Sequence, residues 1–313
     1  MILRALIVDT YRQILSNRVF RILAALSALV VFMSFAVQIL PDRIRIFWGM
    51  WEQTYSPLPV HPEWVRMVIW NIQQVLVIGL AGVTGMFLSV AATASFTPDA
   101  MRPGTLHLYL SRPLSRTRLL LSHYLGGLLF VAILALFLLG GTTLGFRTSS
   151  GIVLPGYLLC TLPIVALFAV LFAFSTLIGV ITRSTPASLV ATLILWTVST
   201  ALRPIHDGIA KGESFLFDVL RSLEWPVWPV RILEGLYWVL PKTAEAKYFQ
   251  ARFFYWGWPD ALDDTEMDGP MESFMESSAH WTAGDMALSI GTSAAFAAAC
   301  LAMAVWRLHR RDV

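Results

Sequence analysis

Long apolar stretches alternate with polar, proline-containing intervals along this chain. Six stretches come close to or exceed the roughly 20 residues that a helix needs to cross the hydrocarbon core of a membrane. Because lipid offers no partners to backbone N–H and C=O groups, each stretch is predicted to be a helix. The six spans are residues 22–40, 69–97, 119–144, 157–181, 187–202 and 286–306. Pro163 is expected to kink the fourth span, and the short fifth span is expected to include part of residues 182–186.

The bulk composition supports the same class. Of 313 residues, 57% are hydrophobic and 14% are charged, and the mean hydropathy is +0.66, which is too apolar for a soluble domain of this length. A signal peptide is the rival interpretation of the first span, but about twenty residues precede its apolar core, more than a signal peptide has there. We therefore expect an all-α integral membrane protein with a single transmembrane domain over residues 1–313.

The arginines define the expected orientation, because short cytoplasmic loops retain positive charge. They concentrate in residues 1–21, 98–118 and 307–311, whereas residues 203–285 hold an acidic cluster between Asp260 and Glu276. Both termini and the 98–118 loop are therefore predicted to be cytoplasmic, and residues 203–285 extracytoplasmic. The net charge of +3 is then a topology signal, and a nucleic-acid partner is not expected.

Three segments outside the spans are predicted to form helices. Residues 1–21 predict an amphipathic interface helix along the inner membrane surface, either a basic anchor or a contact for a cytoplasmic partner. Residues 214–224 and 230–240 predict short helices at the outer leaflet between spans five and six, with an ordinary aromatic-containing loop as the alternative. Their bounding prolines are Pro226, Pro229 and Pro241.

The loop at 98–118 is the most patterned part of the chain. Pro98, Pro103 and Gly104 are expected to break the preceding helix, and residues 105–111 can form about two helical turns. Ser115 is expected to cap the next span. A short helix held between two spans can transmit force to both, although a basic loop that only fixes orientation fits the same residues.

Several kinds of chemistry have no signature here. There is no GxxxxGK[ST] motif, HExxH or GxSxG, and the three lysines, Lys211, Lys242 and Lys247, are on the predicted outer side. The span centres carry no charges, unlike those of most ion-coupled carriers. Cys160 and Cys300 lie in apolar stretches without a CxxC or His-rich neighbourhood. We expect no catalytic residues, no cofactor and no metal site.

The stretch from Asp99 through Gly104-Thr105-Leu106 to Arg116, followed by His123-Tyr124-Leu125-Gly126, resembles the signature loop of ABC-2 type permeases, the membrane subunits of one class of ABC transporters. The interface helix, six spans, coupling helix, outer short helices and the Leu240-Pro241 pair are similar to that family over nearly the whole chain. Two features depart from it: the family commonly has glutamate where Asp99 or Arg102 stands and lysine where His123 stands.

The resemblance implies an exporter subunit driven by a separate ATP-binding ABC chain, in a prokaryotic inner (plasma) membrane. That ATPase would contact the interface helix through Arg4, Ile7, Tyr11 and Arg12, and the coupling loop through Asp99, Arg102, Gly104, Thr105, Leu106, Leu108, Leu110 and Arg112. Two permease copies, as a homodimer or pseudo-dimer, would form the pathway. The small residues Gly79, Gly82, Gly85 and Ser89 in span two would allow close helix approach.

Two other functions remain open from the sequence. One is an ion-coupled carrier, which the uncharged span centres disfavour. The other is a non-transporting membrane component that acts on an extracytoplasmic partner through residues 260–276.

Overall fold

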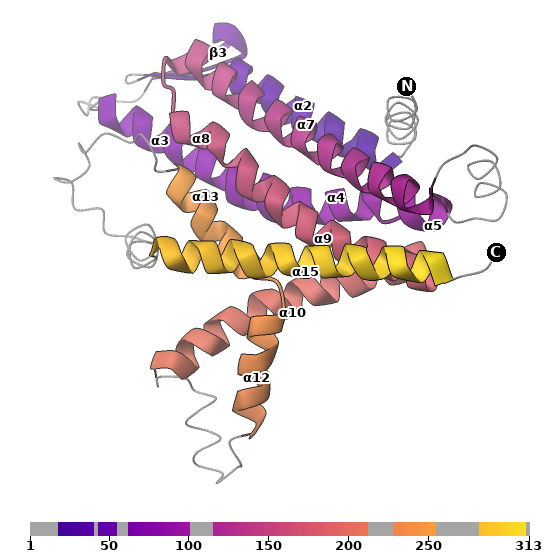
Figure 1. The fold of residues 1–313 in the computed structure, drawn as a ribbon. Coiled ribbons are helices and arrows are strands. Elements are labelled where there is room, and N and C mark those ends of the chain that lie inside the picture. The colour runs from indigo at the N-terminus through magenta and orange to yellow at the C-terminus, as the bar shows by residue number, and fades with distance from the viewer. Residues whose placement is uncertain are drawn as a thin grey trace. The chain divides into compact units, whose positions relative to one another are not determined.

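The computed structural model describes residues 18–40, 43–54, 62–100, 115–211, 228–254 and 282–310, which are mostly helical (Figure 1). The helices are α2 (Arg18–Ala36), α3 (Pro62–Val75), the π-helix η2 (Leu76–Thr84), α4 (Gly85–Thr93), α5 (Phe96–Ala100), α7 (Arg116–Ser150), α8 (Pro155–Leu159), α9 (Thr161–Thr182), α10 (Thr185–Lys211), α12 (Trp228–Val239), α13 (Ala246–Phe254) and α15 (Ala283–Arg310). The strands are β1 (Val37–Ile39), β2 (Arg43–Ile46) and β3 (Trp51–Thr54), and the 3₁₀ turns are η1 (Phe47–Gly49) and η3 (Thr243–Glu245).

Six helical segments in the described part of the chain are long and apolar enough to cross a membrane. They are Arg18–Ala36, Val68–Pro98, Thr117–Ser150, Gly156–Thr182, Thr185–Asp207 and Gly284–Arg310. Each overlaps one of the six stretches predicted from hydropathy, so a multi-pass membrane protein is the class that the structure supports.

Several of the span boundaries differ from the predicted ones. α15 begins at Ala283, before the predicted Met286, because Thr282 and Asp285 form a reciprocal capping box with N–O distances of 3.0 and 3.2 Å. α10 continues to Lys211, past the predicted end at Leu202, with Pro204 inside the helix.

Two prolines interrupt their spans within the turn that precedes them, as expected from the missing N–H and the bulk of the ring. A turn at Ala94–Ser95 breaks span two shortly before Pro98, which is itself the third residue of α5. Span four is interrupted at Cys160, between α8 and α9, three residues before Pro163, which is the third residue of α9. A proline in the first turn of a helix costs little, because the N–H group there has no helical partner.

An all-α fold was wrong in one respect, because β1, β2 and β3 form a three-stranded antiparallel sheet directly after α2. Of the two predicted outer helices, residues 230–240 largely correspond to α12, while residues 214–224 lie outside the described residues. The helix α13 was not predicted.

The chain divides into two compact units. The first comprises residues 1–92, 125–168 and 249–278. Ile39 of β1 packs there with Val65 and Ile69 of α3 and Phe146 of α7. Phe254 of α13 has its ring centroid 5.5 Å from that of Trp70 and 6.1 Å from that of Tyr157.

The second unit comprises residues 93–124, 169–248 and 279–313. Ser175 of α9 and Ser188 of α10 hydrogen-bond with 2.8 Å between their hydroxyl oxygens, and a turn of two residues joins these helices. In that turn Arg183 has φ +54°, and its N–H donates to the Gly179 carbonyl at 2.9 Å. The turn therefore holds α9 and α10 together as a helical hairpin.

Candidate functional site

Nearly all the residues expected to contact an ATPase lie outside the described residues. This holds for the interface-helix residues Arg4, Ile7, Tyr11 and Arg12 and for the loop residues Arg102, Gly104, Thr105, Leu106, Leu108, Leu110 and Arg112. Asp99 is placed by its backbone, in α5. The helix that follows the loop begins as expected: the Arg118 N–H donates to the Ser115 hydroxyl at 3.3 Å, which confirms the predicted cap of α7.

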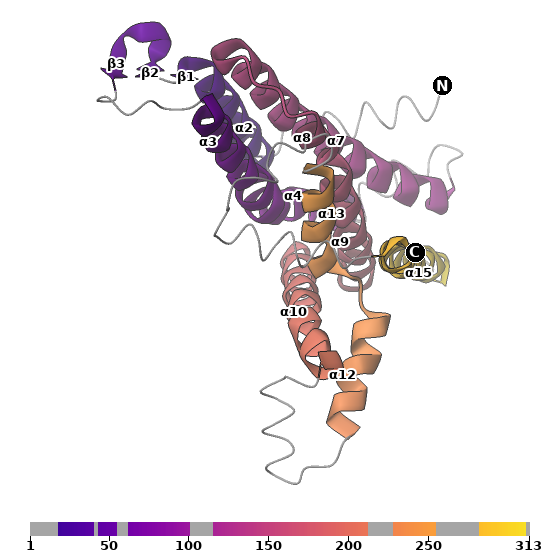
Figure 2. The ribbon, with the colours of Figure 1, turned by 90° about the vertical axis from the view of Figure 1, so that its left-hand side faces the viewer.

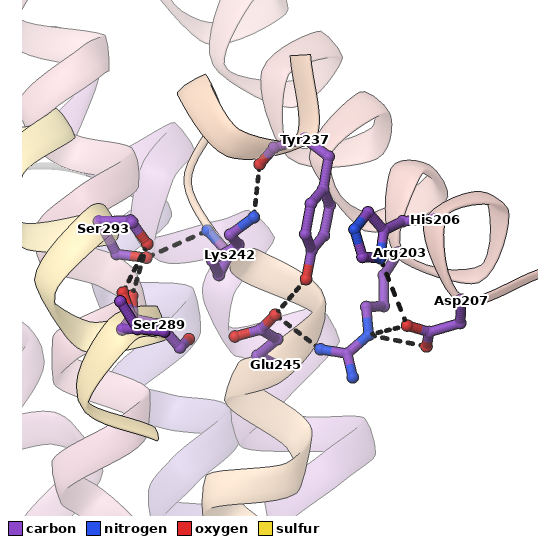
Figure 3. A network of polar contacts seen from close by, with 10 residues as sticks. Arg203, His206, Asp207, Tyr237, Lys242, Glu245, Ser289 and Ser293 are labelled. Atoms are coloured by element: carbon purple, nitrogen blue, oxygen red, sulfur yellow. Dashed lines mark hydrogen bonds and ion pairs between the residues drawn. The ribbon is translucent and has the colours of Figure 1, made fainter. Parts of the chain in front are cut away.

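A polar network of the second unit is the strongest candidate site among the described residues (Figure 3). Arg203 on α10 donates from Nη1 to Oε1 of Glu245 at 2.6 Å, and its Nε contacts the two Asp207 carboxylate oxygens at 3.0 and 2.8 Å. The Tyr237 hydroxyl of α12 donates to the same Glu245 oxygen at 2.8 Å. One carboxylate thus joins α10 and α12.

Local sequence explains how the chain reaches this geometry. Arg203 and Asp207 are four residues apart, one helical turn, so they share a face of α10. Pro204 lacks the N–H group that would otherwise donate to the Thr200 carbonyl within α10. The hydroxyl of Thr200 lies 3.1 Å from the hydroxyl of Thr243, and this hydrogen bond connects α10 to η3. Pro241 cannot continue α12, and the chain turns into η3 at Thr243.

Burial makes the ion pair between Arg203 and Glu245 important for stability. The Glu245 side chain is 5% exposed and that of Arg203 is 15% exposed, whereas Asp207 is 39% exposed. Charges in a low-dielectric site interact strongly but lose much hydration, so the pair is stable only while both partners remain. Burial and the bond to Glu245 also raise the pKa of Tyr237 above its ordinary value.

Lys242 extends the network to α15. Its backbone N–H donates to the Ser293 hydroxyl at 3.0 Å, and its ammonium donates to the Tyr237 carbonyl at 2.5 Å. The ammonium lies over the rings of Tyr237 and Trp238, at 2.9 and 4.7 Å from their centroids. The other face of the network is closed by His206, whose ring stacks on Tyr237 at 3.9 Å.

This arrangement is suited to holding helices together rather than to catalysing a reaction. We call the network of Arg203, Tyr237, Lys242 and Glu245 the latch. Arg203 pairs with Glu245 and Asp207, and the Lys242 ammonium binds a backbone carbonyl. The hydrogen bonds of the network tie α10, α12, η3 and α15 together. Over the described residues, no group of three or more His, Cys, Asp or Glu side chains could hold a metal ion. The first unit holds an apolar cavity of about 30 Å³ between α2, α4 and α7, which is room for about one water molecule.

We expect Lys242 to make stability depend on pH. Burial lowers the pKa of Lys242 to about 8, below the value of about 10.4 in an unfolded chain. Between these values the folded protein binds fewer protons, so its free energy of unfolding should rise with pH, by on the order of 1–3 kcal/mol.

Denaturant titrations in detergent from pH 7 to about 9.5 would measure this rise in a parent that carries Cys160→Ser and Cys300→Ala, because thiols exposed by unfolding would titrate near about pH 8.5. In that parent Lys242→Met should flatten the rise. The range stops short of the ordinary tyrosine pKa of about 10, because the raised pKa of Tyr237 gives the opposite slope above it. An equal slope in the parent and in its Lys242→Met variant would show that Lys242 is not the group responsible.

Local sequence patterns gave only part of this site. The Arg203 and Asp207 spacing is visible in the sequence, and the Leu240-Pro241 pair is part of the family resemblance alone. The partner of Arg203 is 42 residues away, and no local pattern identifies such a pair.

Comparisons with family models, with curated proteins and with solved structures find no match to this chain.

Proposed function

We propose that this chain is the membrane subunit of an ATP-driven ABC transporter of the ABC-2 type, an exporter of a prokaryotic plasma membrane. A separate ATP-binding chain supplies the energy, and two permease copies form the pathway. The observation that carries the proposal is the loop at 98–118, whose sequence resembles the family's signature and which joins the second and third of six candidate spans.

The packing of the second unit supports a coupling role for that loop, because both of its ends contact α9. On one side, a Cβ added at Gly179 would lie 3.2 Å from Thr97 and 3.3 Å from Pro98 of α5. On the other, Tyr124 of α7 stacks on Phe172 at 5.5 Å and donates to the Ala169 carbonyl at 2.9 Å. A force on the loop would therefore reach α9 through two contacts.

Within the same unit, α10 connects α9 to the latch. α9 is joined to α10 by the two-residue turn and by the Ser175–Ser188 hydrogen bond, and α10 carries Arg203 near its other end. Coupled movement of α9 and α10 would act on the Arg203–Glu245 ion pair and on the α12 and α15 contacts beyond it. In this mechanism ATP hydrolysis on the cytoplasmic side opens or closes an extracytoplasmic latch.

Purification of the tagged chain from its native host, followed by mass spectrometry and an ATPase assay, tests the proposal. We expect a P-loop protein to copurify, and to be lost when residues 104–110 are replaced by a Gly-Ser linker of equal length. The same linker in place of residues 264–270, on the predicted outer side, should leave the complex intact.

Recovery of the chain alone, without ATPase activity, would contradict the proposal. If the chain alone then catalysed uptake driven by a proton or sodium gradient in liposomes, it would be an ion-coupled carrier.

A further inference from the structure

The sheet that follows α2 has one apolar and one polar face. Its register pairs Ile46 with Val37 and Trp51, and Ile44 with Ile39 and Gln53, and paired residues share a face. Four apolar strand residues and Trp51 therefore lie on one side. On the other side Glu52 binds Arg43 at 2.6 Å and Arg45 at 3.5 Å. The sheet is therefore amphipathic. Figure 2 shows its three strands beside the end of α2.

Among the described residues, burial of the apolar side decreases from β1 toward the hairpin tip. Ile39 is buried against α3 and α7, but the tip of the hairpin is exposed: Trp48 is 63%, Met50 is 90% and Trp51 is 68% exposed. The tip is also strained, because Phe47 and Trp48 have φ values of +51° and +56°, which cost a bulky residue about 1–2 kcal/mol each. A strained turn that presents large apolar side chains to water would be unfavourable.

A direct chain connection and a ring contact place the tip close to the end of α2, one of the candidate membrane spans. β1 begins at Val37, directly after α2 ends at Ala36, so no linker separates the sheet from the span. The ring of Trp48 lies 6.1 Å from that of Phe32, which is four residues, or about 6 Å of helix, inside the end of α2. Phe32 is itself exposed on the outside of the unit. The tip therefore folds back along the exposed surface of α2.

We propose that this hairpin lies in the outer leaflet of the membrane, with Trp48, Met50 and Trp51 among the phospholipids and the Arg43–Glu52 face toward the headgroups and water. Tryptophan prefers this depth, where its ring is in an apolar layer and its N–H reaches polar groups. The guanidinium groups of Arg43 and Arg45 on the polar face are of the kind that binds lipid phosphates. The inference requires that α2 crosses the membrane with its N-terminal end inside, the orientation that the arginines predict, and it does not depend on the proposed transport function.

Spin labelling of the full-length protein tests the proposal. The parent carries Cys160→Ser and Cys300→Ala, and Met50→Cys is labelled with a nitroxide in liposomes of phosphatidylcholine and phosphatidylglycerol. Power saturation compares collisions with oxygen, which concentrates in lipid, and with a nickel chelate, which stays in water. We expect the oxygen-to-nickel ratio at Met50 to be several times that at a Thr54→Cys control, because Thr54 pairs with Arg43 on the polar face.

Two results would overturn the inference. A Met50 label as accessible to nickel as the Thr54 label would show that the tip is in water. A label shielded from both reagents would show that protein covers the tip, either another chain or a second copy. Because Met50 is almost fully exposed, its replacement should not affect folding, and an unchanged elution volume of the labelled protein would check this.

Discussion

Replacing Arg203 by methionine should lower the free energy of unfolding by about 3–5 kcal/mol, because it leaves a buried carboxylate without its cation. Glu245 would keep only the hydroxyl bond from Tyr237. The effect is large because of burial: the same charge at an exposed site would find water. Equilibrium unfolding in mixed detergent and SDS micelles, followed by circular dichroism, would measure it.

Asp207 provides the matched control. It binds the same guanidinium, but its side chain is 39% exposed, so Asp207→Asn should cost less than about 1 kcal/mol. The double variant Arg203→Met/Glu245→Met should recover much of the loss, because replacing both partners by apolar groups leaves no unpaired charge. Equal losses for Arg203→Met and Asp207→Asn would show that Glu245 is not buried as described.

Hydropathy predicted the spans well because each requires a long run of apolar residues. It missed the sheet because Val37–Ile39 continues the apolar run of α2, and because the alternation in Arg43–Ile46 lasts only four residues. It missed α13 because that helix mixes polar and apolar residues. Tertiary contacts explain α13: the Cys160 thiol donates to the Gln250 carbonyl at 3.3 Å, and Phe254 packs on Trp70.

The small residues of span two have few close neighbours from other helices in the described part of the chain. Within 4 Å, a Cβ at Gly79 or Gly85 would meet only atoms of neighbouring turns of its own span, while one at Gly82 would also approach Gln250 at 3.8 Å. Within this chain, Gly82 is therefore the glycine of the three that approaches another helix, and the packing of a second permease copy against span two stays a prediction. Small residues are common in apolar helices, so their spacing alone does not identify the helix pair in closest contact.

Among the described glycines of the first unit, those that meet another helix most closely are on α7 and face α2. A Cβ at Gly141 would lie 2.6 and 2.7 Å from the two methyl groups of Val31, and one at Gly145 would overlap the Ser34 hydroxyl and lie 2.9 Å from the Ser34 carbonyl carbon. The two glycines are one turn apart, so they form one continuous contact along α2. Backbone atoms cannot rotate away as a side-chain end can, and Gly145 is therefore the more sensitive position.

The double variant Gly141→Ala/Gly145→Ala should lower the free energy of unfolding by roughly 2–5 kcal/mol, the combined cost of two overpacked sites. Gly140→Ala is the control, because its Cβ would meet only a Leu158 methyl at an ordinary 3.8 Å. Alanine is the better helix former by about 1 kcal/mol, so this control should be neutral or stabilising. The same SDS titration would separate the two effects by sign. If all three alanines stabilised the protein alike, helix propensity would outweigh packing and α2 could not lie this close to α7.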